Sequence, residues 1–87
     1  MNKVWHDKAW AEYLYWQTQD KKTLRRINAL LKDIEREPFD GIGKPEPLLG
    51  NLQGCWSRRI DEANRIVYAI KDNQLIIIQC GGHYGDK

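Results

Sequence analysis

A segment rich in proline and glycine divides the chain into two parts, and it limits the possible folds more than any other feature. It runs from Glu37 to Pro47 and contains three prolines and two glycines. Proline fixes its own φ angle, restricts the residue before it and donates no amide hydrogen bond, so a regular helix cannot continue through this segment. We expect a stiff, irregular loop here, with helices before it and strands after it.

The first part is predicted to hold a short strand at residues 3–5 and two helices. Asp7 is a plausible N-cap for a helix that ends near Thr18, and Asp20 caps a second helix that ends before Pro38. Apolar residues at spacings of three and four predict one buried stripe on each helix. The expected buried positions are Ala9, Trp10, Tyr13, Leu14 and Trp16 in the first helix, and Leu24, Ile27, Leu31 and Ile34 in the second.

The second part is predicted to form three strands, at residues 55–60, 65–70 and 74–80, with a tight turn at Asp72-Asn73. Ile66, Tyr68 and Ile70 alternate along one strand and are expected to face the helices, which places Arg65 on the opposite, open face. The predicted fold class is therefore α+β, with two N-terminal helices packed on a four-stranded antiparallel sheet in the order β-α-α-β-β-β.

Length and composition favour one folded domain that covers residues 1–87. Four tryptophans, four tyrosines and one phenylalanine are a large apolar content for 87 residues. The net charge of +2 is too small to identify a nucleic-acid binder by itself. Cys55 and Cys80 are too far apart for a CxxC pair, and no segment approaches the roughly 20 apolar residues that cross a bilayer. We therefore expect a cytoplasmic protein with no membrane partner.

Several common kinds of site are absent from the sequence. It contains no HExxH, Walker, CxxC or GxSxG pattern, which excludes the commonest metal, nucleotide and acyl-transfer sites. Cleavage of RNA without a metal remains open, because the 2′-hydroxyl of the substrate is the nucleophile. The protein then has to supply only a general base, a general acid and cations for the phosphate. The candidates are Glu46, Arg58, Arg59, Arg65, His83 and Tyr84.

Each candidate also has a simpler interpretation. Glu46 lies between Pro45 and Pro47, which suits a positioned general base. The same pattern is typical of a solvated loop carboxylate between two turn-forming prolines. The arginines offer planar donor forks to phosphate or are ordinary surface residues. His83 is a catalytic acid or an incidental terminal histidine, and Tyr84 stacks on a base or belongs to a frayed end. Trp10 and Trp56 serve packing or base stacking.

Four separate motifs resemble one protein family, the Txe/YoeB family of RelE-like toxins. They are residues 41–48 (GIGKPEPL), residues 54–60 (GCWSRRI), residues 64–68 (NRIVY) and the pair His83-Tyr84. The segments 10–16 and 26–36 fit the same pattern, so the resemblance covers essentially the whole chain.

The resemblance implies a RelE/microbial-ribonuclease-like fold and an endoribonuclease that cuts mRNA in the ribosomal A site during translation, without metal or cofactor. By analogy, Glu46 is the general base, His83 the general acid and Arg65 the residue that stabilises the charged phosphorane. The remaining site residues implied by the family are Arg59, which holds the phosphate, Tyr84, which places the nucleotide, and Lys44, which contacts the RNA backbone.

The family also implies partners. Its members are encoded beside an antitoxin, here of the YefM/Axe-like kind in the Phd family, and they act on the ribosome and mRNA. The toxins are often described as dimers, which implies a homodimer. The sequence departs from the family at two places: Leu49 stands where a basic residue is common, and Gly85, Asp86 and Lys87 extend the chain beyond Tyr84.

A second function class remains open from the sequence. The same arginines and aromatic residues suit a non-catalytic module that binds RNA or the ribosome and blocks translation by occupancy. A third class, a transcriptional regulator, requires affinity for DNA, which a net charge of +2 hardly indicates.

Overall fold

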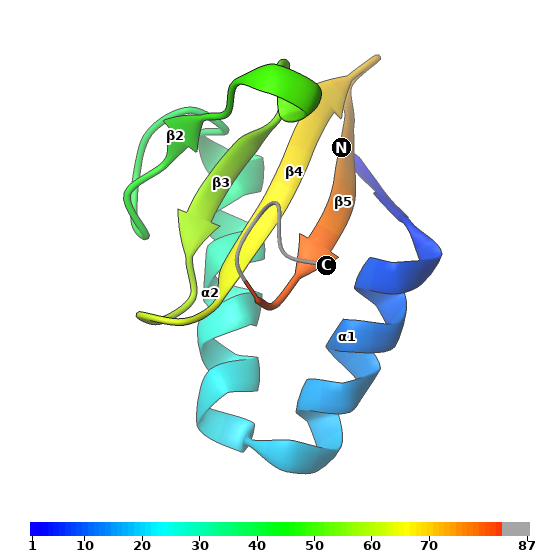
Figure 1. Cartoon of the computed structure of the whole chain (residues 1–87), viewed down its shortest axis with the longest axis vertical. Helices are drawn as coiled ribbons and strands as arrows, with labels where there is room; N and C mark the ends of the chain where they lie inside the picture. The colour runs from blue at the N-terminus through cyan, green and yellow to red at the C-terminus, as the bar shows by residue number, and fades with distance from the viewer. Residues whose placement is uncertain (83–87) are drawn as a thin grey trace.

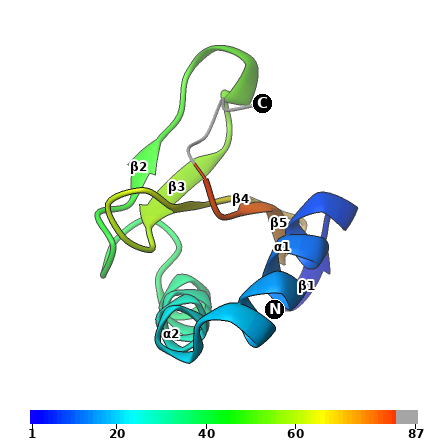
Figure 2. The same ribbon diagram turned by 60° about the horizontal axis from the view of Figure 1, so that its bottom comes forward.

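The computed structural model describes residues 1–82, in which two helices pack against one face of a five-stranded sheet (Figures 1 and 2). The order of the strands across the sheet is β1-β5-β4-β3-β2. The elements are β1 (Asn2–Trp5), α1 (Asp7–Gln19), α2 (Lys21–Arg36), β2 (Glu46–Pro47), a 3₁₀ turn (Gly50–Leu52), β3 (Trp56–Arg59), β4 (Arg65–Lys71) and β5 (Gln74–Cys80).

The prediction of a four-stranded antiparallel sheet is wrong in two respects. The sheet has five strands and is mixed, because β1 pairs with β5 in parallel. No tight hairpin joins these two strands, so their direction is free to follow the packing of the intervening helices on the sheet. The fifth strand is β2, inside the segment expected to be wholly irregular. An edge strand accepts Pro47 because its missing amide donor is not needed on the outer side.

The second helix follows the sequence prediction closely. The carboxylate of Asp20 accepts hydrogen bonds from the backbone amides of Lys22 and Thr23, at 3.0 and 3.3 Å, as an N-cap does. The predicted residues Ile27, Leu31 and Ile34 are buried, whereas Leu24 is only half-buried. Leu30, which was not among the predicted positions, is also fully buried.

The prediction for the first helix is partly wrong. Asp7 is the first helical residue rather than the N-cap, which is His6. Ala9 is fully buried and Tyr13 and Trp16 pack against the core, but two residues of the predicted stripe, Trp10 and Leu14, are 45% and 44% exposed. Trp10 instead contacts Trp5 and Tyr13 at the rim of the core, with ring centroids 5.4 and 5.8 Å apart, respectively.

The strand predictions hold to within one residue at each end. Asp72 and Asn73 have φ angles of 53° and 58°, as the two central residues of a type I′ hairpin turn require. Ile66 and Tyr68 are fully buried against the helices and Ile70 packs beside them, which confirms the predicted core face of β4.

Arg58 is a structural residue, so its inclusion among the phosphate-binding candidates was wrong. Its side chain is fully buried and all five of its N–H donors have acceptors. Nε donates to the Tyr68 hydroxyl and Nη1 to the Asp33 carboxylate. The other acceptors are the backbone oxygens of Ile42 (3.1 Å), Glu37 (2.6 Å) and Asp40 (2.9 Å). One side chain from β3 therefore holds the whole segment 37–42 against the end of α2.

Neither helix within residues 1–82 has the length and apolar character needed to span a lipid bilayer.

Replacing Arg58 should destabilise the fold strongly. Arg58→Met removes the cation paired with Asp33 and the donor to three carbonyl oxygens, and removing one member of a buried ion pair typically costs about 3 to 5 kcal/mol. We expect a loss of that size in the free energy of unfolding, measured by urea titration. Arg25→Met, on the exposed side of α2, is the matched control and should change it by about 0.5 kcal/mol or less. Equal effects of the two substitutions would contradict this role for Arg58.

Stability should fall at acid pH through Asp33. Hydrogen bonds from the Ile42 amide, and then from Arg58 and Arg36, lower the pKa of Asp33 from 3.8 to about 2. Because the folded pKa is the lower one, the stabilisation is complete above the unfolded value of 3.8 and is lost as the pH falls toward 2. Asp33→Asn should therefore be less stable than the unsubstituted chain at neutral pH. The difference between their free energies of unfolding, measured by urea titration, should become smaller as the pH falls from 3.8 toward 2. A difference that does not change with pH would contradict the assignment.

Candidate active site

Three of the predicted site residues lie on one face of the sheet, opposite the helices. Glu46 is paired with Ser57 across β2 and β3, and Arg59 is paired with Arg65 across β3 and β4. Paired residues point to the same face, as do residues two apart along a strand. Ser57 and Arg59 are two apart, so Glu46, Arg59 and Arg65 share a face, while Arg58 between them points into the core.

The register also gives the spacing of these residues. Strands lie about 4.8 Å apart and successive residues about 3.3 Å apart along a strand, so the Cα atoms of Glu46 and Arg65 are separated by about 12 Å. Both residues have long side chains. A single phosphodiester group between them is within reach of both, whereas residues on opposite faces of the sheet could not meet.

The backbone before Glu46 is anchored from the core side. The oxygen of Gly43 accepts the amide of Arg59 at 2.6 Å. Gly43 has a φ of +82°, and a Cβ atom there would lie 2.8 Å from a methyl carbon of Leu30, so only glycine fits this close approach to α2. Lys44 follows with a φ of 53° and an exposed side chain. The loop thus delivers Lys44 and Glu46 to the edge of the sheet from a fixed base.

The Arg65 side chain lies against the turn that joins β3 to β4. Its Nη1 atom donates to the backbone oxygens of Asp61 at 3.1 Å and Glu62 at 3.4 Å. Within the described residues, Nη1 is its only side-chain nitrogen with a hydrogen-bond partner, which leaves the edge formed by Nε and Nη2 as a planar fork. Such a fork matches two oxygens of a phosphate group.

The end of β5 is hydrogen-bonded to Arg65. The Arg65 amide donates to the Gly82 oxygen at 2.8 Å, and the Gly81 amide donates to the Arg65 oxygen at 3.0 Å. The two remaining predicted site residues, His83 and Tyr84, lie outside the described residues. The last residue before them, Gly82, is therefore hydrogen-bonded to Arg65.

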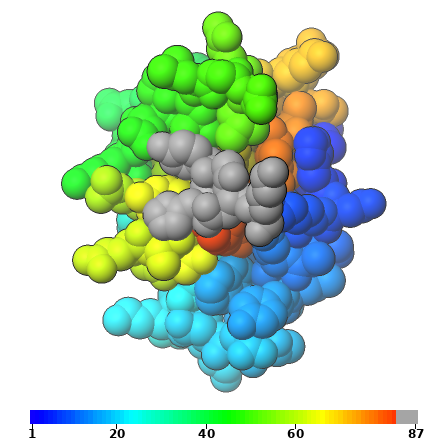
Figure 3. All heavy atoms as spheres, viewed as in Figure 1, coloured from blue at the N-terminus to red at the C-terminus, as the bar shows by residue number. Residues whose placement is uncertain are grey.

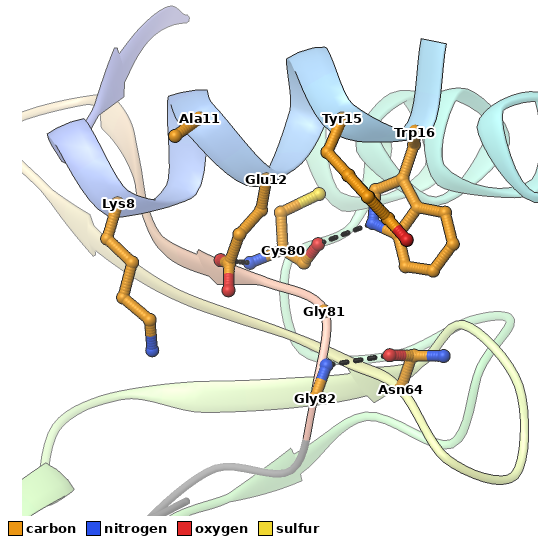
Figure 4. Close-up of a pocket in the computed structure, with 9 residues that line it drawn as sticks. All are labelled: Lys8, Ala11, Glu12, Tyr15, Trp16, Asn64, Cys80, Gly81 and Gly82. Carbon is orange, nitrogen blue, oxygen red and sulfur yellow. Dashed lines mark hydrogen bonds between the residues drawn. The ribbon is translucent and has the colours of Figure 1, made fainter. Parts of the chain in front are cut away.

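A groove of about 550 Å³ lies between α1 and this end of β5 (Figure 4). Tyr15, Trp16 and Glu12 line it from α1, and Asn64 and Gly81-Gly82 line it from the sheet side. In the space-filling view, α1 (blue) and the segment around residues 45–55 (green) lie on opposite sides of the strand ends (Figure 3).

The cysteines lack the properties of nucleophiles. Both are free, and burial raises the pKa of Cys55. Burial, with a smaller effect from the Glu12 carboxylate, raises the pKa of Cys80 to about 12, so this thiol stays protonated at neutral pH. In residues 1–82 no three His, Cys, Asp or Glu side chains are grouped so that they could hold a metal ion.

Glu12, Trp16 and Asn64 all contact the backbone of residues 80–82, but none of them was predicted as a functional residue, and Trp16 was expected only as a buried one. Glu12 and Trp16 are four residues apart on α1, so they share a helix face, but they are more than 60 residues from their partners. The one available signal was the pair Gly81-Gly82, because two glycines directly before a functional residue need external contacts to hold them in place.

A profile of the family described as YoeB-like toxins of bacterial type II toxin–antitoxin systems matches residues 5–84. Toxin YoeB of Escherichia coli (strain K12) is 52% identical to the chain over 84 residues, which are 97% of this chain and 100% of that protein.

Solved structures give the same result. The YoeB/ParE toxin from Agrobacterium tumefaciens superposes with a TM-score of 0.94 at 43% identity, over 97% of this chain and 100% of that one. The toxin in a heterotetrameric YoeB–YefM complex from Staphylococcus aureus gives 0.89 at 45% identity, over 97% and 98%. The chain therefore belongs to the family of YoeB-like toxins of bacterial type II toxin–antitoxin systems.

Proposed function

We propose that this chain is a metal-independent endoribonuclease that cuts mRNA in the A site of the translating ribosome and so inhibits translation. The observation that carries the proposal is the strand register, which brings Glu46, Arg59 and Arg65 to one face. In addition, the backbone of Arg65 is hydrogen-bonded to Gly81 and Gly82, which directly precede His83 in the sequence. Membership of the toxin family supports the same conclusion.

The reaction needs only groups that this face supplies. The Glu46 carboxylate takes the proton of the 2′-hydroxyl, and the 2′-oxygen attacks the neighbouring phosphorus. The bond from phosphorus to the 5′-oxygen then breaks, and His83 in its protonated form donates a proton to that oxygen. The products are a 2′,3′-cyclic phosphate and a 5′-hydroxyl end, and no electrons are exchanged with any cofactor.

The basic residues stabilise the charge that develops on the phosphate. The fork formed by Nε and Nη2 of Arg65 donates to the non-bridging oxygens of the pentacoordinate phosphorane, and Arg59 on the neighbouring strand holds the ground-state phosphate. Lys44 contacts the RNA backbone beside Glu46, and Tyr84 places the nucleotide. Leu49, which is 84% exposed, stands where the family commonly has a basic residue, so this chain lacks one ionic contact to RNA.

An antitoxin is the expected partner that restrains this activity. The YoeB of Staphylococcus aureus forms a heterotetrameric complex with YefM and also has a structure described as a dimer. We infer that this chain likewise binds a YefM-like antitoxin and forms a homodimer. An exposed face with several cations suits an acidic segment that folds on binding.

Substitution of the proposed base or acid should slow cleavage strongly without affecting folding. We expect Glu46→Gln and His83→Gln each to lower the rate of mRNA cutting by about 10² to 10⁴, as is typical for a general acid or base. The rate is measured in a reconstituted translation reaction by primer extension to the new 5′ ends. A message with a single 2′-deoxy nucleotide at the cut site should resist the unsubstituted toxin, because it lacks the nucleophile.

The matched control is Glu37→Gln, since Glu37 is also exposed and also precedes a proline but lies at the end of α2. It should cut at the normal rate. Arrest of translation without new 5′ ends would overturn the proposal and indicate instead a module that acts by occupancy.

A further inference from the structure

The last described residues, Cys80 to Gly82, are held by a complete set of backbone hydrogen bonds. Each of their three amides and three carbonyl oxygens has a partner. Two glycines in succession have the greatest conformational freedom that a chain can have, so fixing them costs more entropy than fixing other residues. That cost suggests that the position of this segment matters.

Side chains of α1 take the place of a missing strand on one side of Cys80. The parallel pairing of β1 with β5 ends at Trp5 and Ile77, so β1 does not reach Cys80. There, Glu12 accepts the Cys80 amide at 2.9 Å, and Trp16 donates its indole N–H to the Cys80 oxygen at 2.8 Å (Figure 4). Two residues one helical turn apart thus bind both backbone polar groups of a single residue, Cys80.

The two glycines are fixed from the other side. The Asn64 side-chain oxygen accepts the Gly82 amide at 2.7 Å, and the backbone of the adjacent Arg65 binds both glycines. Gly81 has a φ of +148°, and a Cβ atom there would lie 3.3 Å from the Trp16 indole nitrogen. The glycine therefore allows the strand end to pass close to α1 and still turn toward Arg65.

We propose that Glu12, Trp16 and Asn64 are positioning residues that set the location of the general acid at position 83. This rests on the proposed function, because it assigns His83 that role. The three residues touch neither substrate nor reacting atoms; they fix the backbone through Gly82, and the next residue is His83. A shift of about 1 Å in a reacting group can lower a rate by about 100-fold, so this anchoring has a direct effect on turnover.

The test uses two substitutions at one position in the full chain. Glu12→Ala removes the acceptor of the Cys80 amide, whereas Glu12→Gln keeps a carbonyl oxygen there. In the ribosome-dependent cleavage assay we expect Glu12→Ala to lower kcat by about 10- to 100-fold with KM unchanged, and Glu12→Gln to restore most of it. Trp16→Phe, which loses only the indole donor and some ring area, should give the same split between kcat and KM.

A second measurement separates positioning from folding and from the function itself. Hydrogen exchange of the Cys80 and Gly82 amides, followed by NMR on the isolated protein, should speed up in Glu12→Ala and in Asn64→Ala, respectively, while exchange in the core of β4 does not change. If Glu12→Ala exposes the Cys80 amide but cuts at the normal rate, or lowers kcat and raises KM equally, the positioning role is wrong. Failure of the unsubstituted chain to cut would instead refute the proposed function, whatever the exchange data show.

Discussion

The hydrogen bonds of the buried Arg58 guanidinium join the sheet, the end of α2 and the loop that follows it. A charge inside a protein is tolerated only if it is paired and its donors are satisfied, and here one carboxylate, one hydroxyl and three carbonyl oxygens do so. The Tyr68 hydroxyl extends the network by donating to the Pro38 oxygen at 2.6 Å. The loop that begins at Glu37 is thereby fixed to both the helix and the sheet.

As a consequence, Glu46 has a fixed position although it follows a long loop. The loop continues through Gly43, which packs on α2, and enters the edge strand β2 at Glu46. On the other side of the face, α1 and Asn64 fix the end of β5 beside Arg65. The loop that leads to Glu46 and the end of β5 are far apart in the sequence. The first is anchored to β3 and the second to β4, and these two strands are paired with each other.

The sequence predicted those features that depend on neighbouring residues. The Asp20 cap, three of the four predicted buried residues of α2 and the turn at Asp72-Asn73 are local features, and each was confirmed. Features that depend on distant contacts were missed. The alternation along β3 cannot tell which of two adjacent arginines points inward, because the answer depends on Asp33, 25 residues earlier. Likewise, Trp10 has the spacing of a core residue but is 45% exposed, whereas its neighbour Ala9 is fully buried.

A structure with bound RNA would show whether Glu46, Arg65 and His83 act together on one phosphodiester group. The ligand would be a message in the ribosomal A site with a 2′-O-methyl group at the cut site, which prevents attack. We expect the Glu46 carboxylate within about 3.5 Å of the blocked 2′-oxygen, the Arg65 fork on the same phosphate and the His83 ring on the side of the 5′-oxygen. A phosphate bound away from this face, or one touched by only one of the three side chains, would contradict it.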